Sequence, residues 1–298
     1  MAPGGPWQYL LVDVDGTLLD SQGRIPPRGH AALARAVAAG MTLVLASGRT
    51  YVSLLRVTAD LKLPFHIISN GGAVGLAPVN GEAPEGHPGF APPHAHHARY
   101  VSELAPALWP RLVEALQREG LSVVVFGHRH PEPPLVYVAS ERGDPHFEAY
   151  LGRNRALARV RSHLASAEIP GVVEVAALGE GEAFDRASER VRRRFAAEAE
   201  SHTMVLFIAA KFGKITEFFQ RGTSKWNAFC ALFPAAAPES VVAIGDEAND
   251  REMISRAGLG IAMGNATPEL KALAGRVTAT HDEDGLAQAL EAILGRPG

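Results

Sequence analysis

The most informative stretch of this chain is Tyr9-Leu10-Leu11-Val12-Asp13-Val14-Asp15-Gly16-Thr17-Leu18-Leu19-Asp20. Its apolar start, Tyr9 to Val12, predicts a short buried strand. Because side chains alternate along a strand, Asp13 and Asp15 would point to the same side until the chain turns at Gly16. Two like charges so close repel each other, which suggests a bound cation, and Mg²⁺ prefers oxygen ligands of this kind. A turn at the strand end is the alternative, since Asp-Gly is a common turn signal.

Three distant segments also place polar side chains where an apolar strand ends or a helix begins. One segment, residues 43–50, reads LVLASGRT, and another, residues 241–250, reads VVAIGDEAND. In both, an apolar strand runs directly into hydroxyl or carboxylate groups. The third segment, residues 222–225, reads GTSK and predicts a helix that begins near Lys225, with Thr223 or Ser224 as its N-cap.

With these four segments the chain resembles the haloacid dehalogenase-like (HAD) phosphohydrolases, and among them the Cof-type branch with a C2 cap (subfamily IIB). The motifs DVDGTLL, ASGRT, GTSK and GDEAND follow one another in the family's order. Residues 70–72, which read NGG, and residues 262–266, which read AMGNA, strengthen the resemblance. It implies a doubly wound parallel α/β sheet, the HAD-like Rossmannoid core, with an inserted α/β cap domain after the third strand.

The alternation of apolar strands and amphipathic helices by itself predicts a parallel, doubly wound sheet. In such sheets ligands bind beyond the carboxyl ends of the strands, where Asp13, Ser47, Asn70 and Asp246 are expected. The predicted strands of this core are 9–14, 42–46, 66–69, 241–245 and 259–263, and its predicted helices are 27–39, 51–61 and 286–294.

The middle of the chain has a different texture. Residues 77–98 are rich in proline, glycine and histidine, which predicts an irregular connection. We therefore expect an inserted α/β cap domain at 82–215 and a split core at 1–81 and 216–298. The predicted elements of the insert are strands 122–126, 135–139 and 172–176 and helices 107–119 and 183–200.

The composition narrows the class of protein. With 298 residues, of which 47% are hydrophobic and 20% charged, the chain suits a globular protein of one large or two modest domains. A formal net charge of −3 gives no electrostatic reason to expect a nucleic acid or a membrane surface as partner. Cys230 is the only cysteine, which favours a reducing, cytoplasmic compartment. No apolar stretch approaches the ~20 residues that span a bilayer, and a monomer or homodimer is expected.

The resemblance implies roles for the carboxylates. Asp13 would be the nucleophile that takes the phosphoryl group and releases it to water. Asp15 would protonate the leaving alkoxide and then deprotonate the attacking water. Mg²⁺ would bind the carboxylates of Asp13 and Asp246 and the backbone carbonyl near Asp15, while Asp250 would hold a metal-bound water or Lys225.

Another group would bind the phosphate and the rest of the substrate. Lys225 and Ser47 would contact the non-transferring oxygens, with backbone N–H groups of neighbouring residues assisting. Each residue also has an ordinary alternative: Lys225 as a surface lysine, Ser47 as a helix N-cap, and Asp246 with Asp250 as a pair at a helix start. Asn70 and Asn249 in this group are equally typical of turns. The residues expected in this group are Gly16, Ser47, Gly48, Asn70, Lys225 and Asn249.

Three further features carry less weight. Six histidines in and after the proline- and glycine-rich segment have no fixed geometry and no cysteines beside them. We therefore expect them to be exposed to solvent and not to form a metal site. Four arginines between positions 190 and 194 predict a solvated helix face, with contact of one arginine with an anionic substrate as the alternative. Trp226 stands where Cof-type members usually carry glycine, and it would either narrow the pocket or pack outward against the core. The histidines in question are His87, His94, His96 and His97, followed later by His128 and His130.

These residues predict a Mg²⁺-dependent phosphatase that acts on a small phosphorylated metabolite, such as a sugar phosphate, through an aspartyl-phosphate intermediate. A dehalogenase of the same superfamily needs no metal, so Asp15, Asp246 and Asp250 count against it. A sugar phosphomutase shares the four motifs and the cap position and is the main enzymatic rival. A catalytically silent sensor of a phosphorylated ligand is the alternative from another class, but it has no need for Asp13 and Asp15.

Overall fold

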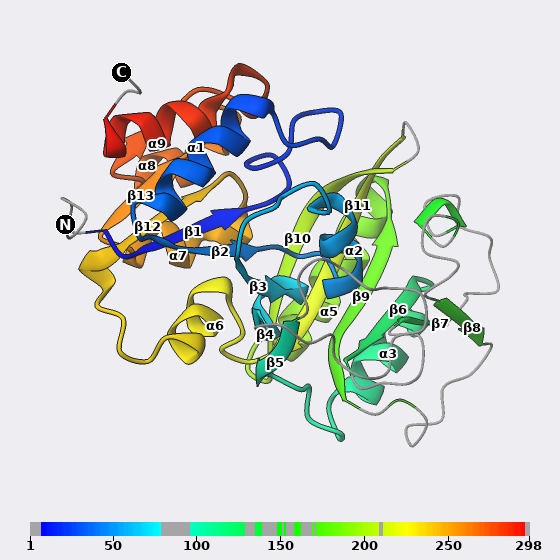
Figure 1. Ribbon diagram of the computed structural model, residues 1–298. Coiled ribbons are helices and arrows are strands. Elements are labelled where there is room, and N and C mark those ends of the chain that lie inside the picture. The colour runs from blue at the N-terminus through cyan, green and yellow to red at the C-terminus, as the bar shows by residue number, and fades with distance from the viewer. Residues whose placement is uncertain are drawn as a thin grey trace. The chain divides into compact units, whose positions relative to one another are not determined.

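The computed structural model describes residues 7–78, 96–128, 135–138, 148–150, 152, 158–161, 169, 171–208 and 211–295. The chain divides into two compact units, one with residues 1–100 and 224–298 and the other with residues 101–223 (Figure 1). Among the described residues, no helix has the length and apolar character that crossing a membrane requires.

The first unit is built on an eight-stranded sheet with the strand order β14-β13-β12-β1-β2-β3-β4-β5. The strands from β14 to β3 run parallel, and β4 runs antiparallel to β3. The chain begins at a central strand and adds strands first on one side and later on the other, so the predicted doubly wound sheet is confirmed. The strands are β1 (Tyr9–Asp13), β2 (Thr42–Ala46), β3 (His66–Ser69), β4 (Val74–Pro78), β5 (His96–Val101), β12 (Val241–Gly245), β13 (Leu259–Ala262) and β14 (Arg276–Val277).

Helices cover both faces of this sheet because its central strands are apolar on both sides. Leu10, Leu11 and Val12 of β1 are fully buried, as expected for a strand between two layers. Helices α1 and α9 pack together on one face, and α6 and α7 lie on the other (Figure 1). The helices are α1 (Pro27–Ala38), α2 (Tyr51–Val57), α6 (Lys225–Leu232), α7 (Arg251–Arg256), α8 (Pro268–Leu273) and α9 (Gly285–Leu294), with 3₁₀ turns η1 (Asn70–Gly72), η3 (Pro238–Ser240), η4 (Ala248–Asp250) and η5 (His281–Glu283).

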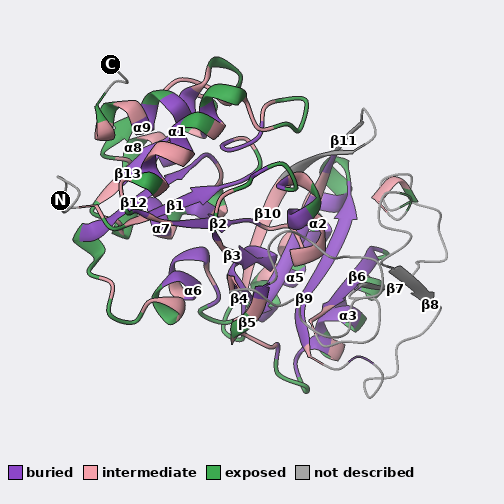
Figure 2. Ribbon diagram, in the orientation of Figure 1, coloured by how far each residue is buried: buried purple, intermediate pink, exposed green. Residues whose placement is uncertain are grey.

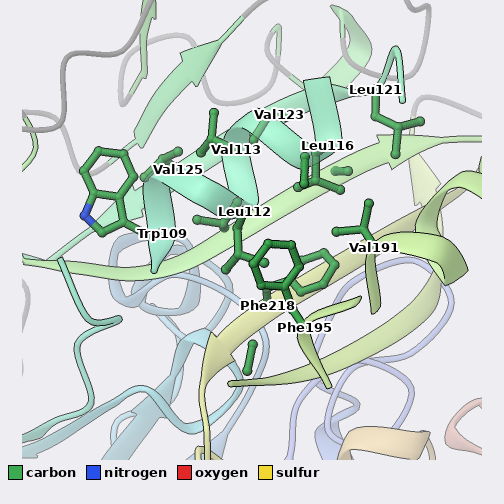
Figure 3. Packing of buried hydrophobic residues seen from close by; sticks show 14 of the residues in the cluster. Trp109, Leu112, Val113, Leu116, Leu121, Val123, Val125, Val191, Phe195 and Phe218 are labelled. Atoms are coloured by element: carbon green, nitrogen blue, oxygen red, sulfur yellow. The ribbon is translucent and has the colours of Figure 1, made fainter. Parts of the chain in front are cut away.

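The second unit contains a six-stranded sheet with the order β10-β11-β9-β6-β7-β8. Its strands pair antiparallel, except that β7 and β8 are parallel. Helices α3 and α5 supply aromatic and aliphatic side chains to a core that includes Trp109, Leu112, Phe195 and Phe218 (Figure 3), and β6 and β9 are buried along their length (Figure 2). The elements are α3 (Trp109–Arg118), β6 (Ser122–Gly127), β7 (Leu135–Val138), β8 (Ala158–Arg161), β9 (Val172–Gly179), α5 (Gly181–Phe195), β10 (Ala199–Ile208) and β11 (Lys211–Gln220).

Two predicted helices extend well past the C-terminal ends of the observed ones. The helix predicted at 183–200 ends at Phe195, because the chain from Ala199 onward forms the hairpin of β10 with β11. The helix predicted at 51–61 ends at Val57, where the next hydroxyl, on Thr58, donates to a carbonyl of the last turn. A hairpin whose pairing extends over ten residue pairs outweighs the local preference for a helix.

The boundaries of the units differ from the boundaries expected for the insert, 82–215. Strand β5 belongs to the eight-stranded sheet, so the first unit extends to residue 100. Strand β11 pairs with β9 and β10 in the six-stranded sheet, so the second unit extends to residue 223. Both observed boundaries lie further toward the C-terminus than the expected ones, because strand pairing, which the local sequence pattern does not show, determines where each unit ends.

Candidate active site

The parallel strands bring several of the predicted residues to one edge of the first unit's sheet. Asp13 ends β1 and pairs in register with Ala46, the last residue of β2, so Ser47 follows at the same level. Asp246 directly follows β12, the neighbour of β1 on the other side. Carboxylate oxygens of Asp13, Asp246 and Asp250 all lie within 4.8 Å of one another.

Lys225 joins this group from the first turn of α6. Its Nζ donates to Asp13 Oδ1 and to Asp250 Oδ1, at 2.6 Å in each case, and lies 3.4 Å from Asn249 Oδ1. The side chain is fully buried, so it is not a surface lysine. Burial opposes the charged form, but the neighbouring carboxylates outweigh that effect and raise the pKa of Lys225.

Two tight contacts set the position of Lys225. The Ser224 hydroxyl accepts a hydrogen bond from the Asn227 N–H, which makes Ser224 the N-cap of α6, and donates to Glu252 Oε2 at 2.7 Å. Gly72, which has a φ of +110°, lies so close that a Cβ there would be 2.2 Å from the Ser224 carbonyl carbon. The turn after β3 therefore needs glycine at this position, and its backbone presses against the start of α6.

Asp13 is a buried carboxylate with one oxygen bound by the Lys225 ammonium. Burial raises the pKa of Asp13 well above its usual range, and Asp250 and Asp246 add to the rise, while Lys225 opposes it. The second oxygen, Oδ2, is buried and has no hydrogen-bond partner among the described residues. Such an oxygen is available to a ligand that the site is built to receive.

Asp246 and Asp250 have different surroundings. Asp246 Oδ1 accepts from the Thr17 hydroxyl at 3.0 Å, and Asp246 Oδ2 accepts from Asn265 Nδ2 at 3.1 Å. Burial raises the pKa of Asp246 to about 7, and the charge of Asp250 contributes. Asp250 uses Oδ1 for Lys225 and Oδ2 for the backbone N–H groups of Asp246 and Glu247, at 2.9 and 3.0 Å.

The arrangement fits a hard divalent cation. Its side-chain donors are carboxylate oxygens, two of the carboxyl groups have raised pKa values, and one buried oxygen of Asp13 is available. Asp13 and Asp246 are the better candidates for direct ligands, because Asp250 already accepts from the Lys225 ammonium and from two backbone N–H groups, whereas each oxygen of Asp246 accepts from one neutral side chain. The Asp15 carboxylate is not a member of this group.

Asp15 is instead paired with Arg49. The guanidinium binds it in a bidentate manner, with Nε 2.8 Å from Oδ2 and one terminal nitrogen 2.7 Å from Oδ1. The same arginine donates to Ser53 Oγ at 3.1 Å, and its backbone N–H donates to Ser47 Oγ at 3.1 Å. Arg49 therefore links the candidate acid/base to a candidate phosphate-binding residue.

Hydrogen bonds also join the loops after β2 and β3. The Gly71 N–H donates to the Ser47 carbonyl at 3.1 Å, and the Asn70 N–H donates to the Arg49 carbonyl at 2.9 Å. Asn70 is buried with a φ of +48°, the left-handed region that asparagine tolerates. Thr50 rather than Ser47 caps α2, and Gly48 is half-buried beside it.

Three residues at this edge were not among the predicted site residues: Thr17, Arg49 and Asn265. Thr17 and Arg49 lie inside the quoted motifs. Neither residue directly follows the end of a strand, so the expectation that site residues lie at strand ends did not single them out. Asn265 follows β13, so applying the same rule to that strand would have included it. Asn265 contacts both Asp246 and the Gly16 carbonyl.

Trp226 and three of the six histidines lie among the described residues. Trp226 is buried and packs on Phe229 with ring centroids 5.5 Å apart, so of the two alternatives it packs into the core. The predicted exposure is wrong for His96, which is buried and hydrogen-bonded to the Phe65 carbonyl at 2.9 Å, since β5 brings it into the sheet. His97 is half-buried, and His128 lies 2.9 Å from Glu103. His87, His94 and His130 lie outside the described residues.

The arginine cluster of α5 forms the solvated face that was predicted. Arg190 pairs with Glu119, and Arg192 and Arg193 pair with Glu189. The arginine side chains keep between 36% and 80% of their surface exposed, so these pairs contribute little to stability.

Sequence comparisons point in the same direction as this geometry. The model of the haloacid dehalogenase-like hydrolase family matches residues 10–83 and 100–290. Phosphatase YwpJ of Bacillus subtilis is 27% identical over 304 residues, which cover 96% of this chain and 100% of YwpJ. The chloroplastic endoribonuclease YBEY of Arabidopsis thaliana is 26% identical over 95% of this chain, and the match spans 46% of that longer protein.

Solved structures share the fold over nearly the whole chain. A haloacid dehalogenase-like hydrolase from Bacteroides thetaiotaomicron is 26% identical, with a TM-score of 0.72 over 96% of this chain and 99% of its own. The HAD subclass IIB sugar phosphatase BT4131 is 21% identical, with a TM-score of 0.71 over 96% of this chain and 98% of its own.

Proposed function

We propose that this chain, which belongs to the haloacid dehalogenase-like hydrolases and to their Cof-type branch, is a Mg²⁺-dependent phosphatase of a small phosphorylated metabolite. The reaction would pass through an aspartyl-phosphate intermediate. The family match covers most of the chain, and the enzyme class is that of the phosphoric monoester hydrolases.

The environment of Asp13 is the observation that carries the proposal. Lys225 holds one carboxylate oxygen at 2.6 Å, and the other oxygen is buried without a hydrogen-bond partner among the described residues. A carboxylate that only stabilised the fold would be expected to have both oxygens satisfied. One fixed oxygen and one available oxygen are what a positioned nucleophile needs.

The chain's own residues supply the two steps. First, an Asp13 oxygen attacks phosphorus, the bond to the leaving oxygen breaks, and that oxygen takes a proton from the Asp15 carboxyl. Then Asp15 takes a proton from water, whose oxygen attacks the phosphorus, and the Asp13 carboxylate and inorganic phosphate are released. The Lys225 ammonium offsets negative charge beside Asp13, and Arg49 restricts the orientation of Asp15.

A cation would be held by Asp13 and Asp246, with Asp250 keeping Lys225 and the loop after β12 in place. When bound, Mg²⁺ would neutralise charge between the carboxylate nucleophile and the anionic phosphate. Ser47, Gly48, Asn70 and Asn249 remain candidates for substrate contact, as does the backbone of Gly16.

The second unit is proposed to set substrate preference, because every quoted motif residue that carries chemistry lies in the first unit. Replacing residues 101–223 with a short Gly/Ser linker is expected to keep hydrolysis of p-nitrophenyl phosphate but remove the ranking among larger substrates. Retention of the parent's ranking by a folded variant would refute this role. A cytoplasmic location is proposed from the single cysteine, Cys230.

The test of the mechanism uses Asp13→Asn and a substrate panel. Sugar phosphates, nucleotides and cofactor phosphates are screened for phosphate release, and the best substrate is labelled with ³²P. Rapid acid quench of the native enzyme should trap label on the protein, while Asp13→Asn should lose label and about 10³-fold or more in kcat. EDTA should abolish turnover and Mg²⁺ should restore it. Turnover by Asp13→Asn above about one per cent of native would refute the covalent mechanism.

A further inference from the structure

Asn265 connects three separate segments at the candidate cation site. Its Nδ2 donates to the Gly16 carbonyl at 2.9 Å and to Asp246 Oδ2 at 3.1 Å. Its Oδ1 accepts from the His281 N–H at 3.0 Å. The nitrogen faces two acceptors and the oxygen faces a donor, so these partners determine the orientation of the amide.

The two donors around Asp246 hold both of its oxygens. Thr17 donates to Oδ1 at 3.0 Å and Asn265 donates to Oδ2, so the carboxylate plane has a donor on each side. A carboxylate with one donor can still rotate about its last side-chain bond, whereas two donors fix that rotation. Gly16 allows the approach, because a Cβ at this position, where φ is +80°, would lie 2.3 Å from Asp246 Oδ2.

The loop that carries Asn265 is itself anchored. The Gly264 N–H donates to the Ala279 carbonyl at 2.9 Å. The Ala266 N–H donates to the Met263 carbonyl at 3.0 Å. Asn265 therefore stands on a braced turn and delivers its amide to Asp246 in a fixed position, although the residue is exposed.

We propose that Asn265 is a positioning residue that orients the Asp246 carboxylate for a divalent cation. This inference rests on the proposed function, since it takes Asp246 as a ligand of that cation. Hydrogen-bond partners of ligating carboxylates act through ligand orientation, and their removal typically lowers metal affinity by about 10–100-fold. The chemical steps assigned to Asp13 and Asp15 do not involve Asn265.

The experiment measures Mg²⁺ binding without turnover. Native protein and Asn265→Ala are stripped with chelator and titrated with MgCl₂ by calorimetry in the absence of substrate. Asn265→Ala is expected to raise the Kd for Mg²⁺ by about 10-fold or more. At saturating Mg²⁺ the remaining loss in kcat should be smaller than the loss in Mg²⁺ affinity, because loss of orientation affects binding of the cation before chemistry.

Lys271→Met is the matched control. It removes the hydrogen bond that Lys271 Nζ donates to the Gly264 carbonyl at 2.6 Å, while the backbone hydrogen bonds of Gly264 and Ala266 still hold the turn and the amide of Asn265 remains. Its Kd for Mg²⁺ should remain within about twofold of native. Melting temperatures in EDTA are recorded for all proteins. If Asn265→Ala melts more than a few degrees lower, Asn265→Gln, whose amide is displaced by one methylene, replaces it with the same expected rise in Kd.

The outcomes separate this inference from the proposed function. If the Kd for Mg²⁺ of the Asn265 variant is within twofold of the native value, the positioning role is overturned and the cation site stays in place. An equal loss of affinity in Lys271→Met would also overturn it, because the effect would then belong to the turn as a whole. Failure of the native protein to bind Mg²⁺ would refute the cation site itself and the inference with it.

Discussion

Replacing Lys225 with methionine perturbs the buried charge cluster most directly. The ammonium lies 2.6 Å from Asp13 and from Asp250, and the exposure of the three side chains is 0–8%. At an effective dielectric constant near 20, opposite charges at such a distance attract by about 6 kcal/mol, and desolvation cancels a large part of this. Lys225→Met removes the cation and leaves two carboxylates buried together.

Breaking a buried ion pair on one side costs about 3–5 kcal/mol of unfolding free energy. We expect Lys225→Met to lower the free energy of unfolding by about 3 kcal/mol, the lower end of this range, because Asp13 can take up a proton and become neutral. Burial already raises the pKa of Asp13 above 3.8, and loss of Lys225 would raise it further. A folded pKa above the unfolded pKa means that the protonated carboxyl favours the folded state. The loss should therefore be small at low pH and grow as the pH rises through the raised pKa.

Urea unfolding followed by circular dichroism, at pH 5 and pH 8 with EDTA present, measures this loss. Lys62→Met, a substitution at an exposed lysine, is the control and should change stability by no more than about 0.5 kcal/mol. Adding Asp13→Asn to Lys225→Met removes one of the two stranded charges and should restore about 1 kcal/mol or more. A loss below about 1 kcal/mol at pH 8, or an equal loss at both pH values, would refute the reasoning.

Three further predictions follow from other contacts. Arg49→Ala should lower kcat by about 10-fold, most strongly for alkyl phosphates with poor leaving groups, and equal losses on p-nitrophenyl and alkyl phosphates would contradict this. It should cost at most about 1 kcal/mol of stability, because the ion pair with Asp15 is partly exposed. Gly72→Ala should destabilise the fold by about 2 kcal/mol or more and shift Lys225, because φ is positive and the added Cβ meets Ser224. Thermal melts measure this loss, and Gly23→Ala, at a positive φ of +72° with open space around the added Cβ, is the control. Burial, and to a lesser extent the charge of His96, lowers the pKa of His66 to about 4. The unfolded chain therefore takes up the proton first, and stability should fall as pH drops from about 6.5 to 4. The dependence of melting temperature on pH across this window should flatten in His66→Gln, and an unchanged slope would count against the assignment.

Local patterns in the sequence were sufficient for the frame of the first unit. The apolar segments that became β1, β2, β3 and β12 were predicted nearly to their ends, because a strand buried on both faces needs a continuous apolar run. Parallel strands place their carboxyl ends at one edge, so the same pattern predicted that Asp13 and Asp246 would meet. The family motifs added the order of the segments and the expected chemistry.

Only the tertiary structure decided which atoms meet at that edge. Asp15 pairs with Arg49, and Asn265 reaches Asp246, through contacts between segments that are far apart in the chain. Trp226 faces the core, and β11 joins the second unit's sheet, although neither outcome is encoded in the neighbouring residues. The physical reason is that alternation and capping are local properties of a few residues, whereas a side chain's partner depends on how distant elements pack together.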